Sequence, residues 1–491
     1  MATRTVLLAC FIHFFSLLWQ SLASPIEDCA RLSRSLPGLV FRNGTREFAE
    51  SITSYFYVQA RLLPACVVSP RDAEEVALAV DFLSKTGSPF AVRGGGHGSV
   101  TGAANVARGI TIDMRSIADV YLDHGTATLK VGAGATWDMV YNRLDPHALS
   151  VLGGRAAHVG VGGYLTGGGI SFFSPQRGFA CDYIINVQVV LSNGTIVNAN
   201  ATHATDLFIA LKGGSNNFGI VTRFDLRTFR QGDLWGGGIV YPNSTFEKLL
   251  GTFTSFKQLE SFDPFAEIEL SFVYLGSSST SIATSSLYYA KPVVNATTFM
   301  PFMLVEPQLS NTLRISNTSD FAKETLALST QNQSSVWATT TFTMTSTILS
   351  RILPIWQASA LAMNRMTTIT SSMTFQSIPP PPPRGMPNSL GFHTKSSPEK
   401  NLVLCLISIF FEDTKSQEDL ELATKDFIRA VDQVAEDEGA EELFTYLNYA
   451  AGWQNPLHDY GDEVLNDLRK VAIEYDPAGI LQKQMGGFKL S

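Results

Sequence analysis

The sequence predicts an α+β protein in two successive parts. From residue 60 to residue 231, short strand-like runs alternate with helical runs and glycine-rich turns. From residue 232 to residue 440, longer strand-like runs are separated by amphipathic helices, which is typical of an antiparallel sheet covered by helices on one face. With 45% hydrophobic and 16% charged residues, the chain is expected to fold around ample cores. The formal net charge of −8 disfavours a nucleic-acid partner.

Residues 1–23 predict a secretory signal peptide. Arg4 precedes the apolar run VLLACFIHFFSLLW, and SLAS offers a small-residue cleavage site after Ala23. The apolar run is shorter than the roughly 20 residues that a membrane span requires, and His13 interrupts it. We therefore expect a secreted glycoprotein with no membrane contact after cleavage. The N-glycosylation sequons that agree with this route are Asn43, Asn193, Asn200, Asn243, Asn295, Asn317 and Asn332.

The cysteines are expected to serve the fold. Cys29 and Cys66 flank the first ordered segments and suit a disulfide in an oxidising compartment. Cys181 and Cys405 lie in apolar strand-like runs, where a buried thiol is usual. The sequence alone does not select among the pairings that these residues allow. It shows no CxxC and no closely spaced pair of histidines, so no metal site is expected.

Residues 64–93 predict a strand, a helix and a second strand. The helix is expected to begin after Ser69, which makes a capping signature with Asp72, and to end at Gly87. The second strand, PFAV, leads directly into RGGGHG. Further strands in GITIDM and TATLKVGAGA, a helix in WDMVYNRL and a hairpin turning at Asn193–Gly194 follow.

The second part is built from longer elements. Strands are expected in GGGIVY, AEIELSFVYL, SLYYA, WATTTFTMT, TITSSMTFQSI and NLVLCLISIFF. Helices are expected in TFEKLLGTFTSFKQL, TILSRILPIWQASALAMNR and SQEDLELATKDFIRAVDQVAEDEG. The prolines at 379–383 predict an extended spacer.

Glycine gathers in residues 94–98, 153–169 and 213–219, which suggests that something approaches the backbone closely. No cluster fits the GxGxxG pattern of a Rossmann site, because Leu165 stands where the third glycine would be required. GxxxxGK[ST] and GxSxG are also absent. Several glycine turns in one module instead predict backbone N–H groups around a pyrophosphate, with His97 in the first turn.

Four linked segments carry a resemblance that covers nearly the whole mature chain. They are PACVVSPRDAEEVALAVDFLSKTGSPFAVRGGGHGSVTGA, HVGVGGYLTGGGIS, LKGGSNNFGIVTRF and the terminal YLNY with YDPAGILQKQ. In this order they resemble the berberine bridge enzyme-like branch of the vanillyl-alcohol oxidase flavoproteins, in the version found in secreted fungal oxidases. The resemblance implies an N-terminal segment at 24–59 and a two-part PCMH-type FAD-binding domain at 60–231. It also implies a substrate-binding domain at 232–440 and a C-terminal segment at 441–491 that returns to the FAD domain.

The same resemblance implies one covalent link between His97 and the 8α carbon of FAD. Relatives that form a second link carry a cysteine where this chain has Ala156. Tyr164 stands where plant relatives often have a histidine near the flavin. The resemblance assigns the cofactor to Arg93, Gly94, Gly95, Gly96, His97, Gly98, Ser99, Val159, Gly160, Gly162, Gly163, Tyr164, Gly168, Gly169, Gly219, Ile220, Val221 and Asn448.

For catalysis the resemblance points to Tyr449 and Tyr446, and to Val159 as a residue that admits dioxygen to the flavin. A phenol acts as a base only if its neighbours lower its pKa, and both tyrosines could instead merely pack against the flavin ring. The expected activity is an oxidase that takes hydride from an alcohol, an amine or a secondary-metabolite-like molecule and makes hydrogen peroxide from dioxygen. A flavin-dependent cyclase or isomerase, or a dehydrogenase with another acceptor, remains open.

Overall fold

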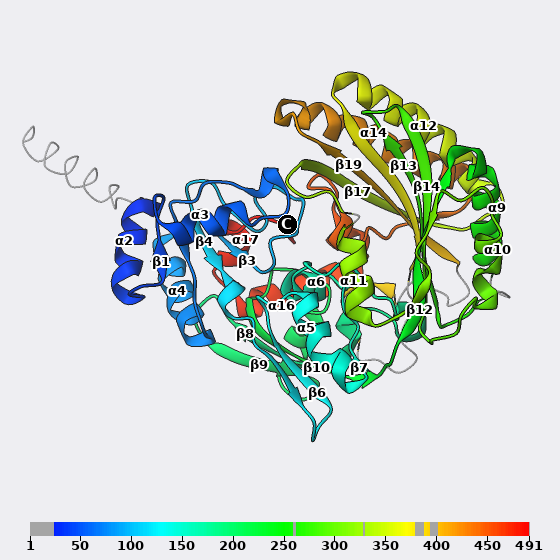
Figure 1. Cartoon of the computed structure of the whole chain (residues 1–491). Coiled ribbons are helices and arrows are strands. Elements are labelled where there is room, and N and C mark those ends of the chain that lie inside the picture. Colours follow the sequence, from blue (N-terminus) through cyan, green and yellow to red (C-terminus); the bar gives the residue numbers. More distant parts are fainter. Residues whose placement is uncertain (1–23, 259–261, 328, 379–386, 393–400, 491) are drawn as a thin grey trace, which may run out of the picture.

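The chain folds into two lobes that lie beside each other (Figure 1). The predicted α+β class is confirmed, since both lobes combine helices with sheets. The predicted signal peptide at 1–23 and the proline run at 379–383 lie outside the residues that the computed structural model describes, which are 24–258, 262–327, 329–378, 387–392 and 401–490.

The first sheet contains the predicted strand–helix–strand unit. Its strands, in the order β1-β2-β4-β3, are Val40–Phe41, Cys66–Val68, Ile110–Asp113 and Phe90–Arg93. Both β2 and β3 run parallel to β4, and α4 (Ala73–Thr86) connects them. The expected helix start is wrong by three residues. Just after β2, Ser69 donates its backbone N–H to the carbonyl of Leu39, and the Asp72 carboxylate caps α4 by accepting from the N–H of Glu75.

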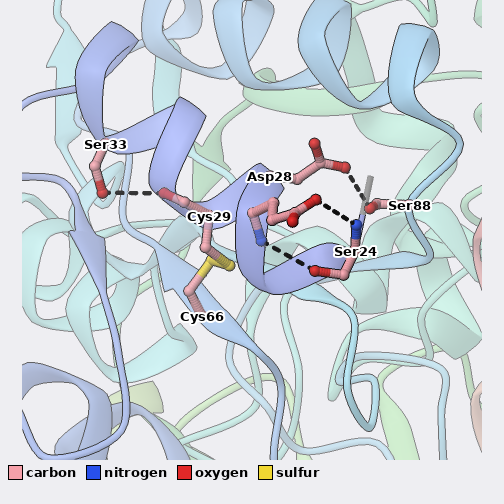
Figure 2. Close-up of a disulfide and its surroundings, with 7 residues drawn as sticks. Ser24, Asp28, Cys29, Ser33, Cys66 and Ser88 are labelled. Carbon is pink, nitrogen blue, oxygen red and sulfur yellow. Dashed lines mark hydrogen bonds between the residues drawn. A yellow bond between two sulfur atoms is a disulfide. The ribbon is translucent and has the colours of Figure 1, made fainter. Parts of the chain in front are cut away.

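A disulfide fastens the N-terminal helix α2 (Pro25–Ser35) to this sheet. It joins Cys29 to Cys66 in β2, and both residues are fully buried (Figure 2). Beside it, the carboxylate of Asp28 accepts a hydrogen bond from the hydroxyl of Ser88 at 2.7 Å. The helix begins with a capping box in which Ser24 and Glu27 cap each other's N–H groups. The first described segment of the chain is thereby tied to the first sheet.

A second sheet completes this lobe. Its strands, in the order β5-β6-β10-β8-β9, are Val120–Asp123, Thr128–Gly132, Ile220–Arg227, Ile184–Val190 and Ile196–Asn200. The hairpin β8–β9 turns at Asn193–Gly194 as predicted. Cys181 is buried as expected, but it lies in a 3-10 turn (Ala180–Tyr183) ahead of β8 rather than in a strand. Besides α2 and α4, the α-helices before the chain crosses to the second lobe are α3 (Arg46–Thr53), α5 (Trp137–Leu144), α6 (Val161–Thr166), α7 (Ser174–Arg177) and α8 (Thr205–Ala210).

The second lobe is one antiparallel sheet with helices on one face (Figure 1). Its strand order is β15-β12-β14-β13-β18-β19-β17-β20, with β16 beside β12. The strands are β12 (Leu234–Pro242), β13 (Ala266–Leu275), β14 (Thr280–Tyr289), β15 (Ser310–Asn311), β16 (Arg314–Ser316), β17 (Ser334–Thr343), β18 (Ile369–Ser377), β19 (Leu402–Phe411) and β20 (Glu441–Glu442). The helices on the covered face are α9 (Phe246–Phe256), α10 (Met300–Met303), α12 (Ile348–Met366) and α14 (Gln417–Asp437). Helix α11 (Thr318–Ala327) lies on the other side and packs into the core of the first lobe.

Side-chain alternation divides the two faces of this sheet. Along β13, Ile268, Leu270 and Phe272 belong to the core under the helices, whereas Glu269 and Ser271 face the first lobe. This alternation turns a polar row of side chains toward the space between the lobes.

The chain crosses between the lobes and then returns. It leaves through β11 (Phe229–Arg230), which pairs with β7 (Leu149–Ser150), and it enters β12 four residues later. After α15 (Pro456–Asp459), helices α16 (Asp462–Tyr475) and α17 (Ile480–Gln484) pack into the cores of the first lobe. Over the described part of the chain, none of the helices has the length and apolarity that a bilayer span needs.

Candidate functional site

A cavity of about 660 Å³ lies between the glycine-rich loops of the first lobe and the polar face of the second sheet. Its first-lobe wall includes Gly94, Gly95, Gly96, His97, Gly98, Ser99, Val159, Gly160, Gly162, Gly163, Tyr164, Gly219, Ile220 and Val221. Its second-lobe wall comes from β13, β14, β18 and β19, and the C-terminal segment adds residues 446–450. Most of the predicted cofactor residues are therefore brought to one cavity.

Two of the glycine turns touch each other. A Cβ added to Gly160 would lie 2.3 Å from the backbone N of Gly95, and one added to Gly95 would lie 2.6 Å from the Cα of Gly160. Real side chains do not approach a backbone so closely, so both positions require glycine. The contact aligns the loop after β3 with the loop before α6 along one wall of the cavity.

His97 lines the cavity and has one unpartnered ring nitrogen. Its ring stacks on Phe56, with centroids 4.1 Å apart, and meets the edge of Tyr57. Its Nε2 is shielded from solvent and has no hydrogen-bond partner among the described residues. Burial lowers the pKa of His97 to about 4, so the imidazole is neutral near pH 7. Neutral imidazole is the nucleophilic form of this side chain.

Arg93 is not among the residues that line the cavity, which corrects the expectation that the resemblance implied. Its guanidinium turns away, lies 3.9 Å from the ring centroid of Tyr55, and bonds the backbone carbonyl of Ser51. Nη1 also lies 3.6 Å from the carboxylate of Asp113. A buried cation needs such partners, and α3 and β4 supply them. Gly96, with φ +73°, packs directly over this guanidinium, so Arg93 supports the loop from beneath.

Gly168 and Gly169 also stand back from the cavity. Both have left-handed backbone angles, with φ +103° and +85°, and they turn the chain after α6. A Cβ at Gly169 would lie 2.5 Å from the ring of Tyr164, so this glycine makes room for the tyrosine that does line the cavity. Their contribution is to the shape of the wall.

The C-terminal segment brings a tyrosine and an asparagine to the same wall. Asn448 donates through Nδ2 to the backbone carbonyl of Tyr164 and to the hydroxyl of Tyr446, both at 3.1 Å. Tyr446 is buried, and burial raises the pKa of its phenol beyond the ordinary range. Tyr446 is therefore held as a structural part of the wall, next to Tyr449 with ring centroids 4.9 Å apart.

Tyr449 meets a buried arginine that the sequence reasoning missed. Arg155 donates from Nη2 to the phenolic oxygen of Tyr449 at 3.0 Å and to Oε1 of Gln376 at 2.6 Å. From Nη1 it pairs with Glu267 at 2.6 Å, and Glu269 lies 3.1 Å from Nη2. Burial raises the pKa of the Tyr449 phenol, and the positive charge of Arg155 acts against that rise. The only sequence signal for Arg155 was its place beside Ala156, inside the second glycine cluster.

The second-lobe wall is rich in hydroxyl groups. On neighbouring strands, Ser271 lies opposite Thr284 and Thr374, and Ser372 lies opposite Ser408. Trp337, Tyr57 and Phe410 add aromatic surface at one end. The sequence reasoning placed strands here but named none of these residues, because alternation shows which residues share a face and not what that face meets.

Ala156 and Val159, which follow Arg155 in the chain, also line the cavity. Both are small and half-buried. Cys181 and Cys405 are free and buried, and neither lines the cavity. Within the described ranges, no group of three His, Cys, Asp or Glu side chains is arranged to hold a metal ion.

The residues present fit an FAD molecule. His97 lines the cavity, its Nε2 has no partner among the described residues, and the loops around 94–99, 160–164 and 219–221 bring several glycines to the wall. Backbone N–H groups in such turns can bind a pyrophosphate. Asn448 and Tyr164 would lie beside the flavin end of the same cavity.

Comparison with known proteins supports this reading of the site. A family model described as FAD binding domain matches residues 64–200. The FAD-dependent monooxygenase drtC of Aspergillus calidoustus is 33% identical over 475 residues, which cover 95% of this chain and 90% of that protein.

Solved structures share the fold at low sequence identity. Glucooligosaccharide oxidase from Acremonium strictum, whose structure title names a 6-S-cysteinyl, 8α-N1-histidyl FAD, has a TM-score of 0.73 at 16% identity and covers 92% of this chain and 97% of its own. The BBE-like 1 protein of Physcomitrella patens has a TM-score of 0.70 at 18% identity. The match covers 93% of this chain and 97% of that protein. At these identities the likeness establishes the fold alone.

Proposed function

Because this chain belongs to the berberine bridge enzyme-like family of FAD-binding flavoproteins, we propose that this FAD-dependent oxidoreductase works as an oxidase. FAD bound in the cavity would accept a hydride from the substrate and later pass the two electrons to dioxygen, which gives hydrogen peroxide. The observation that carries the proposal is the cavity itself, which His97 enters from the glycine loops and Tyr449, paired with Arg155, enters from the C-terminal segment.

His97 is proposed to hold the FAD through one covalent bond. Its neutral imidazole and its unpartnered nitrogen support this role. Ala156 lines the cavity where a second, cysteinyl link would need a thiol. The free cysteines Cys181 and Cys405 are buried away from the cavity and do not replace it.

Tyr449 is proposed to take the proton of the substrate hydroxyl. Its oxygen receives hydrogen bonds from Arg155 and, at 3.5 Å, from Gln376. Both donors stabilise the phenolate form, and the cationic donor does so most strongly. The hydroxyl of Tyr446 is instead engaged by Asn448, so Tyr446 is assigned a packing role.

The cavity favours a neutral, hydroxyl-bearing substrate over a charged amine. Among the described residues that line it, Glu269 is the only carboxylate, and Arg155 already pairs with it at 3.1 Å. A substrate ammonium would therefore find no unshared counter-charge, which is costly in a buried site. The hydroxyl groups of the sheet can instead bond a neutral alcohol, and Trp337 and Phe410 can pack against its carbon skeleton.

Val159 is proposed to leave space for dioxygen beside the flavin. It lies directly before Gly160 on the wall of the cavity, and its side chain is small and half-buried. Reoxidation by dioxygen, rather than by another acceptor, is the step that depends on this space.

The test is to compare oxygen consumption with peroxide release during turnover of a panel of neutral alcohols, with the matching amines as controls. An oxidase releases one peroxide for each oxygen consumed, and no label from 18O-labelled dioxygen enters the product. A monooxygenase is the second candidate, because that is the name of the relative from Aspergillus calidoustus. It would place one labelled oxygen atom in the product. A cyclase without net redox would consume no oxygen while converting its substrate.

Secretion is proposed as the route of this chain. The Cys29–Cys66 disulfide supports an oxidising compartment. Asn200 differs from the other sequon asparagines because it is half-buried and its Nδ2 donates to Asn186, so it is the least available acceptor. Endoglycosidase treatment followed by peptide mapping should find glycans on some of the exposed acceptors, which are Asn43, Asn193, Asn243, Asn295, Asn317 and Asn332.

A further inference from the structure

A second, smaller cavity lies behind the buried arginine. It has a volume of about 50 Å³, and its lining includes Lys257, Glu267, Asp263 and Ser377. That is room for a few water molecules at most. Glu267 spans the distance from this cavity to Arg155, which it meets at 2.6 Å, and Arg155 lines the main cavity.

We propose that Glu267 is a positioning residue for Tyr449, acting through Arg155, and that it exchanges protons with solvent through the small cavity. This inference rests on the proposed role of Tyr449 as the proton acceptor. Glu267 itself is not among the described residues that line the main cavity, so its action on the substrate is indirect.

The hydrogen bonds of Arg155 explain why the position of its guanidinium depends on Glu267. The two hydrogens on Nη2 are used by Gln376 and Tyr449, and Nη1 is directed at Glu267. If Glu267 were removed, the guanidinium could turn toward Glu269, whose carboxylate is already 3.1 Å away. The hydrogen bond to Tyr449 would then lengthen or break. Glu267 thus fixes the plane in which Arg155 meets the phenol.

The charges around Glu267 couple its protonation to that of Tyr449. Three charged groups act on it: Arg155, Glu269 two residues along β13, and Lys257 just after α9. Asp263, ahead of β13, lines the same small cavity. Burial raises the pKa of Glu267 to about 8, against the influence of Arg155, and burial lowers the pKa of Lys257 to about 8. Both groups therefore change charge near the pH at which an enzyme works.

When Glu267 is protonated and neutral, the positive charge of Arg155 stabilises the Tyr449 phenolate. When Glu267 is ionised, its negative charge partly cancels that stabilisation. Loss of a proton from Tyr449 and gain of a proton by Glu267 therefore favour each other. The phenol proton leaves toward the main cavity, Glu267 takes one from solvent in the small cavity, and no electrons move. The buried charge stays constant while the base is formed.

The test is Glu267→Gln, which keeps the shape and the acceptor oxygen but cannot ionise. In the wild-type holoenzyme, ionisation of Glu267 opposes ionisation of Tyr449 as the pH rises. In the variant, the acidic limb of the kcat/KM profile should move to lower pH by about one unit, and KM should stay near the wild-type value. Glu267→Leu should lower kcat by on the order of tenfold or more because Arg155 loses its anchor. Glu267→Asp should restore part of this loss.

A readout independent of turnover is the ultraviolet titration of tyrosinate in the flavin-loaded protein, taken as the difference from Tyr449→Phe. In Glu267→Gln this difference should appear at lower pH than in the wild type. The matched control is Asp432→Asn, whose carboxylate bonds Thr340 on the helix-covered side of the sheet, and it should leave both profiles unchanged.

Two outcomes would overturn the inference, and they differ in what else they overturn. If Glu267→Gln keeps the wild-type kcat/KM profile and tyrosinate titration while Tyr449→Phe is strongly impaired, Glu267 has no positioning role and the proposed function stands. If Tyr449→Phe is fully active, the proposed proton acceptor is wrong, and the role of Glu267 is lost with it.

Discussion

The guanidinium of Arg155 lies 3.0 Å from the phenolic oxygen of Tyr449, although 294 residues separate them in the chain. Arg155 comes from the loops of the first lobe, and Tyr449 comes from the segment that follows the second sheet. Arg155 is 6% exposed, so little solvent screens its charge from the phenol. Both lobes and the C-terminal segment must be in place before this pair can form.

Tyr449→Phe should lower kcat/KM by about 100-fold or more, the usual range for loss of a general base. Because the base is the phenolate, wild-type kcat/KM should rise with pH toward the raised pKa of Tyr449, and the variant should lose this dependence. Steady-state peroxide assays across pH would show both effects. Tyr446→Phe serves as the comparison. Its kcat/KM should fall less, because the hydroxyl of Tyr446 bonds Asn448 rather than Arg155. Equal losses in the two variants would remove the distinction between them.

His97→Ala should yield a protein that releases all of its flavin on acid precipitation, whereas wild type should retain it in the pellet. Peptide mapping of wild type should find a single flavin-bearing peptide, with RGGGHG in its sequence. Because the pKa of His97 is lowered to about 4, its imidazole stays neutral as the pH falls through 6, and covalent loading should persist there. A second flavin peptide containing Cys181 would show that the single-link assignment is wrong.

Val159→Leu should slow reoxidation of the reduced flavin by air at least tenfold, equivalent to about 1.4 kcal/mol on that barrier. The added methylene stands at the cavity wall, where it can be accommodated without loss of the fold. Reduction by substrate should continue at nearly the wild-type rate, because Val159 is not part of the Arg155–Tyr449 pair. Stopped-flow absorbance separates the two half-reactions. Slow reoxidation in the wild type would instead favour the dehydrogenase or cyclase alternative.

Gly160→Ala should destabilise the protein, whereas Gly163→Ala should not. The new Cβ at 160 would lie 2.3 Å from the backbone of Gly95, while a Cβ at 163 meets no atom within 4 Å. Forcing the two loops apart should cost about 1–3 kcal/mol and lower the thermal midpoint by several degrees. Thermal unfolding of both variants without flavin checks this without relying on activity. Equal midpoints would mean that the loops separate freely.

Replacing both Cys29 and Cys66 by serine should destabilise the first lobe by about 3–4 kcal/mol, because the bond closes a long loop in the unfolded chain. The sequence separation is 37 residues. Chemical denaturation of the variant and the wild type measures the difference. Cys405→Ala is the control for loss of a buried thiol that is not in a disulfide. Non-reducing mass spectrometry that finds free thiols at both positions would contradict the pairing.

Local patterns in the sequence were enough to predict strands such as β13 and the glycine-rich loops. The alternation in AEIELSFVYL predicts β13 over its observed bounds, because one face of that strand is a helix-covered core. RGGGHG marks a place of close backbone approach, because only glycine tolerates the contact between residues 95 and 160. The predicted start of α4 was wrong for a local reason. The backbone hydrogen bond from Ser69 to Leu39 outweighed the tendency of Ser69 to cap a helix.

Tertiary structure alone decided which side chains these elements bring together. Arg93, which stands in the predicted cofactor loop, points away from the cavity because its buried charge finds partners in Ser51 of α3 and Asp113 of β4. Arg155 reaches Glu267 and Tyr449 because two lobes and a returning C-terminal segment meet at one cavity. A one-dimensional pattern records which face of its own element a residue lies on. Partners more than a hundred positions away are set by how the lobes pack, and the chemistry of this site depends on those partners.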